Sequence, residues 1–247
     1  MIMPNSNFEI PFNELTTLKS IFSQDQDLLI FDVGANDGAG SLEYLNTFPN
    51  SHIVAFEPCV SAFSALMENI NLKPRIRAVN LALSDSNGKE ILYVHPFNMN
   101  KTSSLNRIVK SSNSIQNSLH PKINSGLEFI YEQPTITQTL DSWLSENLDI
   151  AIKLTSFCSL LKIDVQGAEL RVLSGAEKVL RENLFDVIRL ELTLDDVYEI
   201  PNDYVPGVFS LLYSANYILY DVSHIYKDLD RVRTLWMDLI FVQGALI

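Results

Sequence analysis

The chain has 247 residues, of which 47% are hydrophobic and 19% are charged, so it can build one large core but is too short for two domains with a cleft between them. Its formal net charge of −12 would repel a nucleic-acid backbone. No apolar run approaches the roughly 20 residues that span a bilayer, and the N-terminus lacks the pattern of a secretory signal. We therefore expect one cytoplasmic domain over residues 1–247, with no nucleic-acid partner and no stable membrane insertion.

The first predicted element is a helix over residues 13–22, whose apolar residues recur at helical spacing: Leu15, Leu18, Ile21 and Phe22. This helix belongs to an expected N-terminal helical cover, residues 1–25, that lies across the first strand. That strand is predicted over residues 28–33, because a continuous apolar run is typical of a buried parallel strand.

The stretch 28–40 (LLIFDVGANDGAG) is typical of a strand that delivers a nucleotide-like cofactor to a glycine-rich turn. Gly34 and Gly38 would let the backbone come close to the ligand, which a side chain would block. The acid at the end of the strand, Asp32, has two interpretations: it caps backbone amides of the turn, or it contacts the ligand.

A second strand is predicted over residues 52–56, and it ends in Glu57 followed by Pro58. A carboxylate about 20 residues beyond a glycine turn is placed to accept hydrogen bonds from both hydroxyls of a cofactor ribose. The two segments together therefore predict a cofactor site.

Helices and strands alternate in the next part of the chain. Helices are predicted over residues 41–48 and 59–70, the second with an apolar stripe, and a third strand over residues 76–83; the stripe consists of Phe63, Leu66, Met67 and Ile70. This alternation favours a mainly parallel sheet with right-handed crossovers. Residues 84–89 (SDSNGK) form a turn by composition, and residues 90–95 are predicted to return as a hairpin.

Residues 96–133 lack a sustained hydrophobic period and are rich in Asn, Ser, Lys and Pro, so we interpret them as an inserted lobe. A stretch of this length is more often a functional lid or a mobile segment than a packed element, and a disordered insertion without a role is the alternative. His95 and His120, in or near the lobe, are expected to be solvated loop residues, and a role as proton acceptors is the alternative.

The C-terminal half continues the alternation. Strands are predicted over residues 135–139, 159–165, 185–192, 217–222 and 236–242, and helices over residues 168–182 and 205–213. Thr139 is expected to cap a short helix that ends near residue 146. Enough strands are therefore available for a seven-stranded sheet. The two cysteines, Cys59 and Cys158, have neither framework nor metal-ligand spacing and are expected as free thiols.

Acids follow the predicted strands at the ends where open parallel sheets bind their ligands. They are Asp32, Glu57, Asp85 next to Ser84, Asp164 and Glu191. Burying an unpaired carboxylate costs several kcal/mol, so these acids favour a polar ligand with cationic or hydroxyl groups. Asp85 is placed to receive an adenine amino group, with an Asx turn as the alternative.

The glycine turn departs from the G-x-G-x-x-G pattern of nicotinamide enzymes, because Asn36 and Ala39 stand at the second and third glycine positions counted from Gly34. The second glycine lets a pyrophosphate approach the backbone, so an oxidoreductase is the weaker alternative. S-adenosylmethionine has no phosphate and fits better: its adenosine suits Glu57 and Asp85, and its sulfonium suits the acidic turn.

Five motifs resemble the FkbM-type S-adenosylmethionine-dependent methyltransferases: FDVGANDG at 31–38, FEP at 56–58, ALSDSNG at 82–88, TLDSWL at 139–144 and LLKIDVQGAELRVLSGAE at 160–177. The resemblance implies a Rossmann-like α/β fold of class I. Such a fold has a mainly parallel seven-stranded sheet with helices on both faces and an antiparallel last strand. It also implies methylation, usually of a hydroxyl on a sugar or secondary metabolite. Gln166 departs from the family, which commonly has Glu there.

On this interpretation the acceptor oxygen attacks the sulfonium methyl in line, the enzyme contributes mainly positioning, and a base removes the hydroxyl proton late. The candidate catalytic residues are Asp164, Glu169 and Glu191. For Glu169, a favourable charge in the first turn of its helix is the alternative. Lys162 is expected to pair with a neighbouring acid. The candidate cofactor-binding residues are Asp32, Gly34, Asn36, Gly38, Glu57, Pro58, Ser84, Asp85, Asp164 and Val165.

A divalent cation shared by Asp164 and Glu191 is a less favoured hypothesis, and no metal ligands are assigned. The expected partner is a small-molecule or glycan acceptor, in a pocket shaped by the lobe and by residues 198–206. A non-catalytic cofactor-binding module of the same fold, indicated by Gln166, is the main functional alternative. The sequence leaves the identity of the acceptor and the oligomeric state open.

Overall fold

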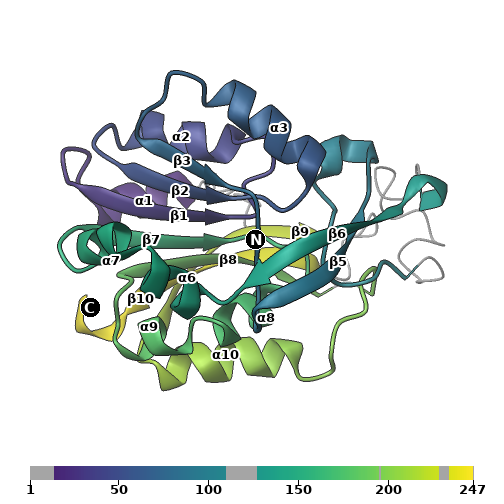
Figure 1. Cartoon of the computed structure of the whole chain (residues 1–247). Coiled ribbons are helices and arrows are strands. Elements are labelled where there is room, and N and C mark those ends of the chain that lie inside the picture. Colours follow the sequence, from purple (N-terminus) through teal and green to yellow (C-terminus); the bar gives the residue numbers. More distant parts are fainter. Residues whose placement is uncertain (1–13, 110–126, 195, 228–233, 247) are drawn as a thin grey trace, which may run out of the picture.

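The computed structural model describes residues 14–109, 127–194, 196–227 and 234–246, and its central element is a seven-stranded sheet (Figure 1). The strand order is β3-β2-β1-β7-β8-β10-β9, with β10 antiparallel to both neighbours and the other pairs parallel. The strands are β1 (Leu28–Val33), β2 (His52–Phe56), β3 (Ile76–Val79), β7 (Cys158–Ile163), β8 (Val187–Thr193), β9 (Tyr217–Lys227) and β10 (Thr234–Gln243). The predicted fold class is confirmed.

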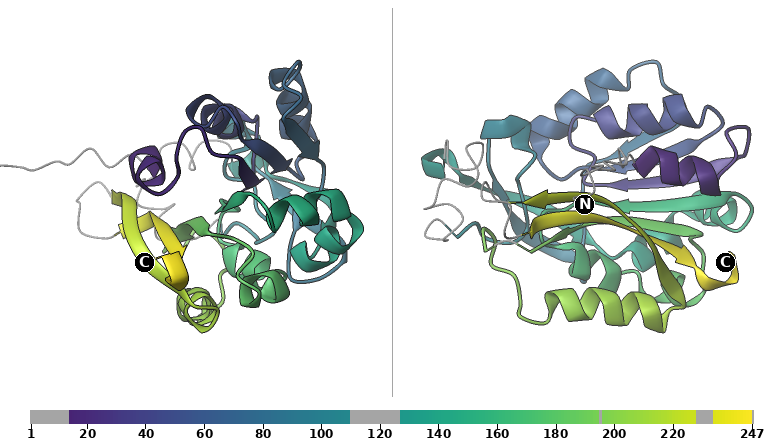
Figure 2. Two further views of the ribbon diagram at one scale, coloured as in Figure 1. Left: turned by 90° about the vertical axis from the view of Figure 1, so that its left-hand side faces the viewer. Right: turned by 180° about the vertical axis from the view of Figure 1, so that it is seen from behind.

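Helices cover both faces of this sheet (Figures 1 and 2). One face carries α1 (Glu14–Ile21), α2 (Ala39–Thr47) and α3 (Val60–Asn69). The other carries α6 (Leu140–Glu146), α7 (Leu148–Leu154), α8 (Glu169–Ser174), α9 (Glu177–Arg181) and α10 (Tyr204–Ser214). Every residue of β1 is buried, because both faces of a central parallel strand are covered. The sheet therefore lies between two separate apolar cores.

The predicted third strand, residues 76–83, is wrong as one element. It divides into β3 and β4 (Ala82–Leu83), which belong to different sheets. The chain turns at Asn80, whose side-chain amide donates to the backbone oxygen of Glu57 at 2.7 Å. This hydrogen bond lies where β3 ends, next to the end of β2. The apolar residues that follow, Ala82 and Leu83, belong to a second sheet.

This second sheet has three strands in the order β4-β6-β5. The strand β5 (Gly88–Val94) pairs antiparallel with β6 (Tyr131–Gln138), so the predicted hairpin of residues 90–95 on the preceding strand is wrong. The first residues of β6 fall within the predicted lobe, residues 96–133. Figure 1 shows β5 and β6 lying across the carboxyl ends of the central strands. Residues 110–126 of the lobe, including His120, lie outside the described residues.

The predicted helix over residues 168–182 is interrupted at Gly175, which separates α8 from α9. A Cβ atom at Gly175 would lie 2.0 Å from the backbone oxygen of Ser84, so the helix packs there against another part of the chain. The carboxylate of Asp141 then accepts the backbone N–H groups of Lys178 and Val179, at 2.9 and 3.1 Å. These contacts start α9 as a new helix, because the first amides of a helix need outside acceptors.

Smaller predictions have mixed outcomes. Thr139 caps α6 by accepting the backbone N–H of Ser142 at 3.1 Å, as predicted. Both cysteines are free thiols. Met67 is 50% exposed and does not join the apolar stripe of α3, since it lies about 100° around the helix from the buried Leu66. In the described part of the chain, no helix is long and apolar enough to cross a membrane.

Candidate active site

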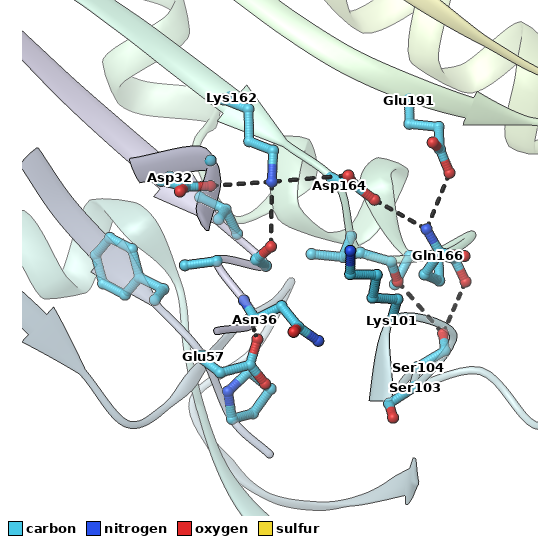
Figure 3. A pocket seen from close by; sticks show the side chains of 18 of the residues that line it. Asp32, Asn36, Glu57, Lys101, Ser103, Ser104, Lys162, Asp164, Gln166 and Glu191 are labelled. Atoms are coloured by element: carbon cyan, nitrogen blue, oxygen red, sulfur yellow. Dashed lines mark hydrogen bonds and ion pairs between the residues drawn. The ribbon is translucent and has the colours of Figure 1, made fainter. Parts of the chain in front are cut away.

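A cavity of about 540 Å³ opens where the carboxyl ends of β1, β2, β7 and β8 meet. The chain leaves β1 toward β2 on one side, and β7 pairs with β1 on the other. Such a switch point is where open α/β sheets bind their ligands, because the connections diverge and leave a crevice. The segment 100–105, between β5 and β6, lines the side of the cavity that faces the strand ends (Figure 3).

The turn after β1 has three residues with positive φ, namely Gly34 (79°), Asn36 (49°) and Gly38 (81°). A Cβ atom at Gly34 would lie 1.9 Å from the backbone oxygen of Asp164. Gly34 is thus required by the close approach of two backbone segments, the ends of β1 and β7. It lines the cavity, whereas Gly38 packs against Leu66 and does not.

Glu57 is buried at the end of β2 and holds the glycine turn in place. Its two carboxylate oxygens accept the backbone N–H groups of Asn36, at 2.8 Å, and Cys59, at 2.7 Å. Burial raises the pKa of this carboxyl to about 7, although both hydrogen bonds lower it. Each oxygen keeps a second lone pair, and Glu57 lines the cavity together with Pro58. The carboxylate therefore fits a ligand that presents two neighbouring hydroxyl groups, as a ribose does.

Asp32 and Lys162 form a buried ion pair in the wall between β1 and β7. Lys162 Nζ lies 2.9 Å from Asp32 Oδ1 and donates to the backbone oxygen of Gly34 at 3.1 Å. The hydroxyl of Ser41 donates to Asp32 Oδ2 at 2.6 Å. Burial lowers the pKa of Lys162, but the charges of Asp32 and Asp164 outweigh burial and raise it. The predicted pairing of Lys162 with a neighbouring acid is confirmed, and Asp32 is engaged by side chains of the protein.

Asp164 and Glu191 line the cavity just after β7 and near the end of β8, and Asp164 Oδ2 lies 3.7 Å from Lys162 Nζ. The amide nitrogen of Gln166 donates to Asp164 Oδ1 and to Glu191 Oε1, both at 2.9 Å (Figure 3). Burial raises the pKa of Glu191 well above its ordinary value, and the charges of Asp164 and Asp238 add to this effect. Burial acts in the same direction on Asp164, but Lys162 and other partners outweigh it, so the pKa of Asp164 is lowered. One carboxyl is thus held ionised while its neighbour retains a proton more readily.

Glu169 does not line the cavity. It is fully buried beneath the turn after β7, where Oε1 accepts the backbone N–H groups of Val165 and Gly167, each at 3.1 Å. Its other oxygen accepts the hydroxyl of Tyr204. Burial raises the pKa of Glu169 to about 7. The structure therefore places this acid as a support of the turn, which neither the catalytic nor the helix-charge interpretation anticipated.

Ser84 and Asp85 also lie outside the residues that line the cavity. Arg171 Nη2 lies 3.0 Å from Asp85 Oδ1 and 2.7 Å from Glu90 Oε1. One part of the cavity wall is apolar and consists of Leu81, Ala82, Leu83 and Leu92. Of the candidate residues, the structure brings the following to the cavity: Asp32, Gly34, Asn36, Glu57, Pro58, Asp164, Val165 and Glu191.

The segment 100–105 was interpreted only as part of a lobe, yet it is packed into the site. Thr102 and Ser104 are buried, and the hydroxyl of Ser104 donates to the backbone oxygen of Gln166 at 2.8 Å. His95 is fully buried, with Nδ1 2.6 Å from Thr102 Oγ1, so its prediction as a solvated residue is wrong. The run of small hydroxyl residues at 102–104 is the signal that could have indicated hydrogen bonding to a neighbouring backbone.

Arg189 is a cavity-lining residue that sequence reasoning missed. It lies in β8, lines the cavity, and has its side chain 8% exposed. Nε is 2.7 Å from Glu14 of α1, and Nη2 is 2.8 Å from Asp238 of β10. The hydroxyl of Tyr44 donates to the other oxygen of Glu14 at 2.6 Å. A single arginine in the apolar run FDVIRLEL was the available signal, since a buried charge needs partners.

Residues 32–219 match the family described as the methyltransferase FkbM domain. The chain belongs to this family. The resemblance inferred from the sequence motifs is confirmed, and the chain is an S-adenosylmethionine-dependent methyltransferase. The family assignment removes the nicotinamide alternative. Among the described residues, no group of three or more His, Cys, Asp or Glu side chains is placed to hold a metal ion.

Two curated proteins are similar to this FkbM methyltransferase in sequence. The 2-O-methyltransferase NoeI of Sinorhizobium fredii is 29% identical over 191 residues, which cover 76% of this chain and 74% of that protein. Methyltransferase 1 of Beauveria bassiana is 28% identical over 153 residues, which cover 61% of this chain and 59% of that protein.

Two solved structures resemble the chain in fold. The FkbM methyltransferase of Methylobacillus flagellatus has a TM-score of 0.49 and 14% identity, with 89% of this chain covered. The match spans only 44% of that longer chain. Fibrillarin of Aeropyrum pernix, solved with bound S-adenosyl-L-methionine, has a TM-score of 0.43 and 13% identity, with coverages of 93% and 73%.

Proposed function

We propose that this FkbM methyltransferase transfers the methyl group to a hydroxyl oxygen of a sugar, a glycan or a small natural product. The observation that carries the proposal is the pair of carboxyl groups, Asp164 and Glu191, on the cavity wall opposite Glu57. A hydroxyl must lose its proton when it is methylated, and such a pair can accept one. The name of the similar 2-O-methyltransferase agrees with an oxygen acceptor.

The residues around the glycine turn fit S-adenosylmethionine. Glu57 would accept hydrogen bonds from the ribose hydroxyls, and the apolar residues at 81–83 with Leu92 would surround the adenine. The negative charges of the carboxylates near the glycine turn suit the cationic sulfonium and the ammonium group of the cofactor. The bound cofactor supplies an electrophilic methyl group.

Glu191 is the group that we expect to take the hydroxyl proton. A general base works best when its pKa lies near the working pH. Burial and the neighbouring charges of Asp164 and Asp238 raise the pKa of Glu191, whereas Asp164 is held ionised by Lys162 and Arg189 and is a weaker base. Two acids with pKa values pushed apart commonly have different roles in one site.

The acceptor side of the cavity favours a polyhydroxylated ligand. The residues that line the cavity include Tyr44, Thr193, Tyr198, Gln166 and Trp236. Hydroxyl groups of a ligand can donate to the carboxylates and to the hydroxyl oxygens of such residues. An aromatic ring offers an apolar face to the C–H groups of a sugar.

The test begins with binding. A thermal shift that rises with the concentration of S-adenosylmethionine or S-adenosylhomocysteine, and not with a nicotinamide dinucleotide, is expected. Transfer of a labelled methyl group is then measured by mass spectrometry against a panel of monosaccharides, oligosaccharides, phenols and amines. Methylated hydroxyls, lost in Glu191→Gln with cofactor binding intact, support the proposal. Methylation of amines alone, or cofactor binding without any transfer, contradicts it.

A further inference from the structure

Gln166 has an unusual backbone conformation in the turn that follows β7. Its φ is 57°, and that of Gly167 is 92°. Positive φ is unfavourable for a residue with a side chain, and persists only when the surrounding structure enforces it. Here the hydroxyl of Ser104 donates to the backbone oxygen of Gln166 at 2.8 Å, and Asn106 Nδ2 donates to that of Gly167 at 2.7 Å. Glu169 supports the same turn from below.

The side-chain amide of Gln166 has hydrogen-bond partners on both of its ends. The nitrogen donates to Asp164 and Glu191, each at 2.9 Å. The oxygen accepts the hydroxyl of Tyr198 at 3.2 Å. The orientation of the amide follows from these partners, because two carboxyl oxygens face its donor end and a phenol faces its acceptor end.

Tyr198 connects this amide with the segment that lines the cavity. Its hydroxyl also lies 3.0 Å from the backbone oxygen of Thr102, and Thr102 contacts the buried His95. Tyr198 itself is buried. The position of the phenol is thus fixed by its contacts with Gln166 and Thr102.

We propose that Gln166 is a positioning residue for methyl transfer: its amide holds the carboxyl groups of Asp164 and Glu191 at fixed places, and Tyr198 fixes the amide. The inference rests on the proposed function of the same cavity. Gln166 adds two donors and no charge between the two acids. The charged groups that act on Glu191 are Asp164 after β7, Arg189 on β8, Asp238 on β10 and Glu169 on α8. Lys101 of the segment 100–105 lines the same cavity.

The first test compares Gln166→Glu with Gln166→Met. The glutamate keeps the shape but adds a negative charge beside Glu191, so we expect the acid limb of the kcat/KM profile to move up by at least about one pH unit. The methionine keeps the length but has no donor, so we expect kcat to fall at least about tenfold as the carboxyl groups lose their placement. The dissociation constant of S-adenosylhomocysteine should stay within about threefold in both variants, because the donors act on the acids and not on the ribose side.

Gln138→Glu is the matched control. Gln138 ends β6, is half-buried like Gln166, and does not line the cavity. The same added charge there should leave the pH profile of methyl transfer unchanged. Tyr198→Phe removes only the hydroxyl that faces the amide oxygen, and should lower kcat without moving the KM of the cofactor.

A second measurement needs no acceptor and separates this inference from the proposed function. The carboxyl carbon of Glu191 is titrated by NMR in protein labelled with ¹³C, with the signal assigned through Glu191→Gln. In Gln166→Glu the midpoint should rise by at least about one unit, and in Gln138→Glu it should not. An unchanged Glu191 midpoint in Gln166→Glu would overturn the inference, whatever the acceptor panel shows. A shifted midpoint with no hydroxyl methylation by the wild-type protein would instead contradict the proposed function alone.

Discussion

The carboxylate of Glu57 accepts the backbone N–H of Asn36 at 2.8 Å, and this hydrogen bond joins the end of β2 to the turn after β1. Asn36 has a positive φ of 49°, a conformation that asparagine adopts more readily than most residues with a side chain. The second oxygen of Glu57 is occupied by the backbone of Cys59. One buried acid therefore both shapes the turn and faces the cavity.

Replacing Glu57 with alanine is expected to weaken the binding of S-adenosylmethionine by about 1–3 kcal/mol, the cost of leaving hydroxyl partners unpaired. Calorimetric titration measures this change. Glu68→Ala, at an exposed acid of α3, is the control and should leave the affinity unchanged. Equal affinities of the wild-type protein and Glu57→Ala would remove Glu57 from the cofactor site.

The affinity for the cofactor should also depend on pH through Glu57. Burial raises the pKa of this carboxyl to about 7 in the free protein, and the ionised form is the better acceptor and attracts a cation. Binding is therefore expected to tighten as the pH rises through about 7, and Glu57→Gln should lack this slope. The effect on folding has the opposite sign: because the folded pKa lies above that of an exposed glutamate, the stabilising contribution of the protonated form is lost as the pH rises through about 7.

The buried pair of Lys162 and Asp32 leads to a prediction about stability. Lys162→Met removes the cation 2.9 Å from Asp32 Oδ1 and leaves a carboxylate that is 1% exposed. Breaking a buried pair in this way costs about 3–5 kcal/mol. Urea unfolding should show this loss, and the double variant Asp32→Asn with Lys162→Met should recover part of it. A double variant that is less stable than Lys162→Met alone would contradict the assignment of the pair.

The sequence predicted the parts of the site that depend on neighbouring residues in the chain. The glycine turn and Glu57 come directly after strands that are recognisable as apolar runs. Lys162, which lies between apolar residues, indicated a charged partner. The position of Glu57 against the turn was predictable because consecutive strands of such a sheet are neighbours.

Other parts depend on contacts between distant segments, which no local pattern contains. The segment 100–105 is held in place by hydrogen bonds of Thr102 and Ser104 and not by an apolar face. Its sequence therefore shows no hydrophobic period. The break between α8 and α9 arises where Gly175 touches Ser84. Glu169 was one of the candidate bases, with a favourable helix charge as the alternative, but its side chain lies beneath the backbone and accepts two amides.

The contact at Gly175 can be tested by adding one methyl group. In Gly175→Ala the new Cβ would lie 2.0 Å from the backbone oxygen of Ser84, so α8 or the turn at Ser84 must move. Such overpacking costs about 1–3 kcal/mol. Gly88→Ala is the control, because the nearest atom to its Cβ is 4.0 Å away. Thermal unfolding should separate the two variants, and equal melting temperatures would contradict the packing.

Glu169 is buried and Glu191 is half-buried, and both have raised pKa values, but their surroundings predict different results on substitution. Glu191 lines the cavity, whereas Glu169 accepts the amides of Val165 and Gly167 and the hydroxyl of Tyr204. Glu169→Ala would leave three buried donors unpaired and should lower the free energy of unfolding by about 2–5 kcal/mol, since each costs about 1–3 kcal/mol and the turn can relax.

Glu169→Gln keeps an oxygen acceptor and is the variant that separates the two roles. We expect it to fold and to retain methyl transfer within about threefold, while Glu191→Gln loses at least about a hundredfold, the usual contribution of a general base. Both rates are measured with saturating cofactor above pH 7, where Glu169, with a pKa of about 7, is largely ionised in the wild-type protein. A Glu169→Gln variant that binds cofactor normally but has lost turnover would show that this acid handles the proton and that its place beneath the turn is not its main role.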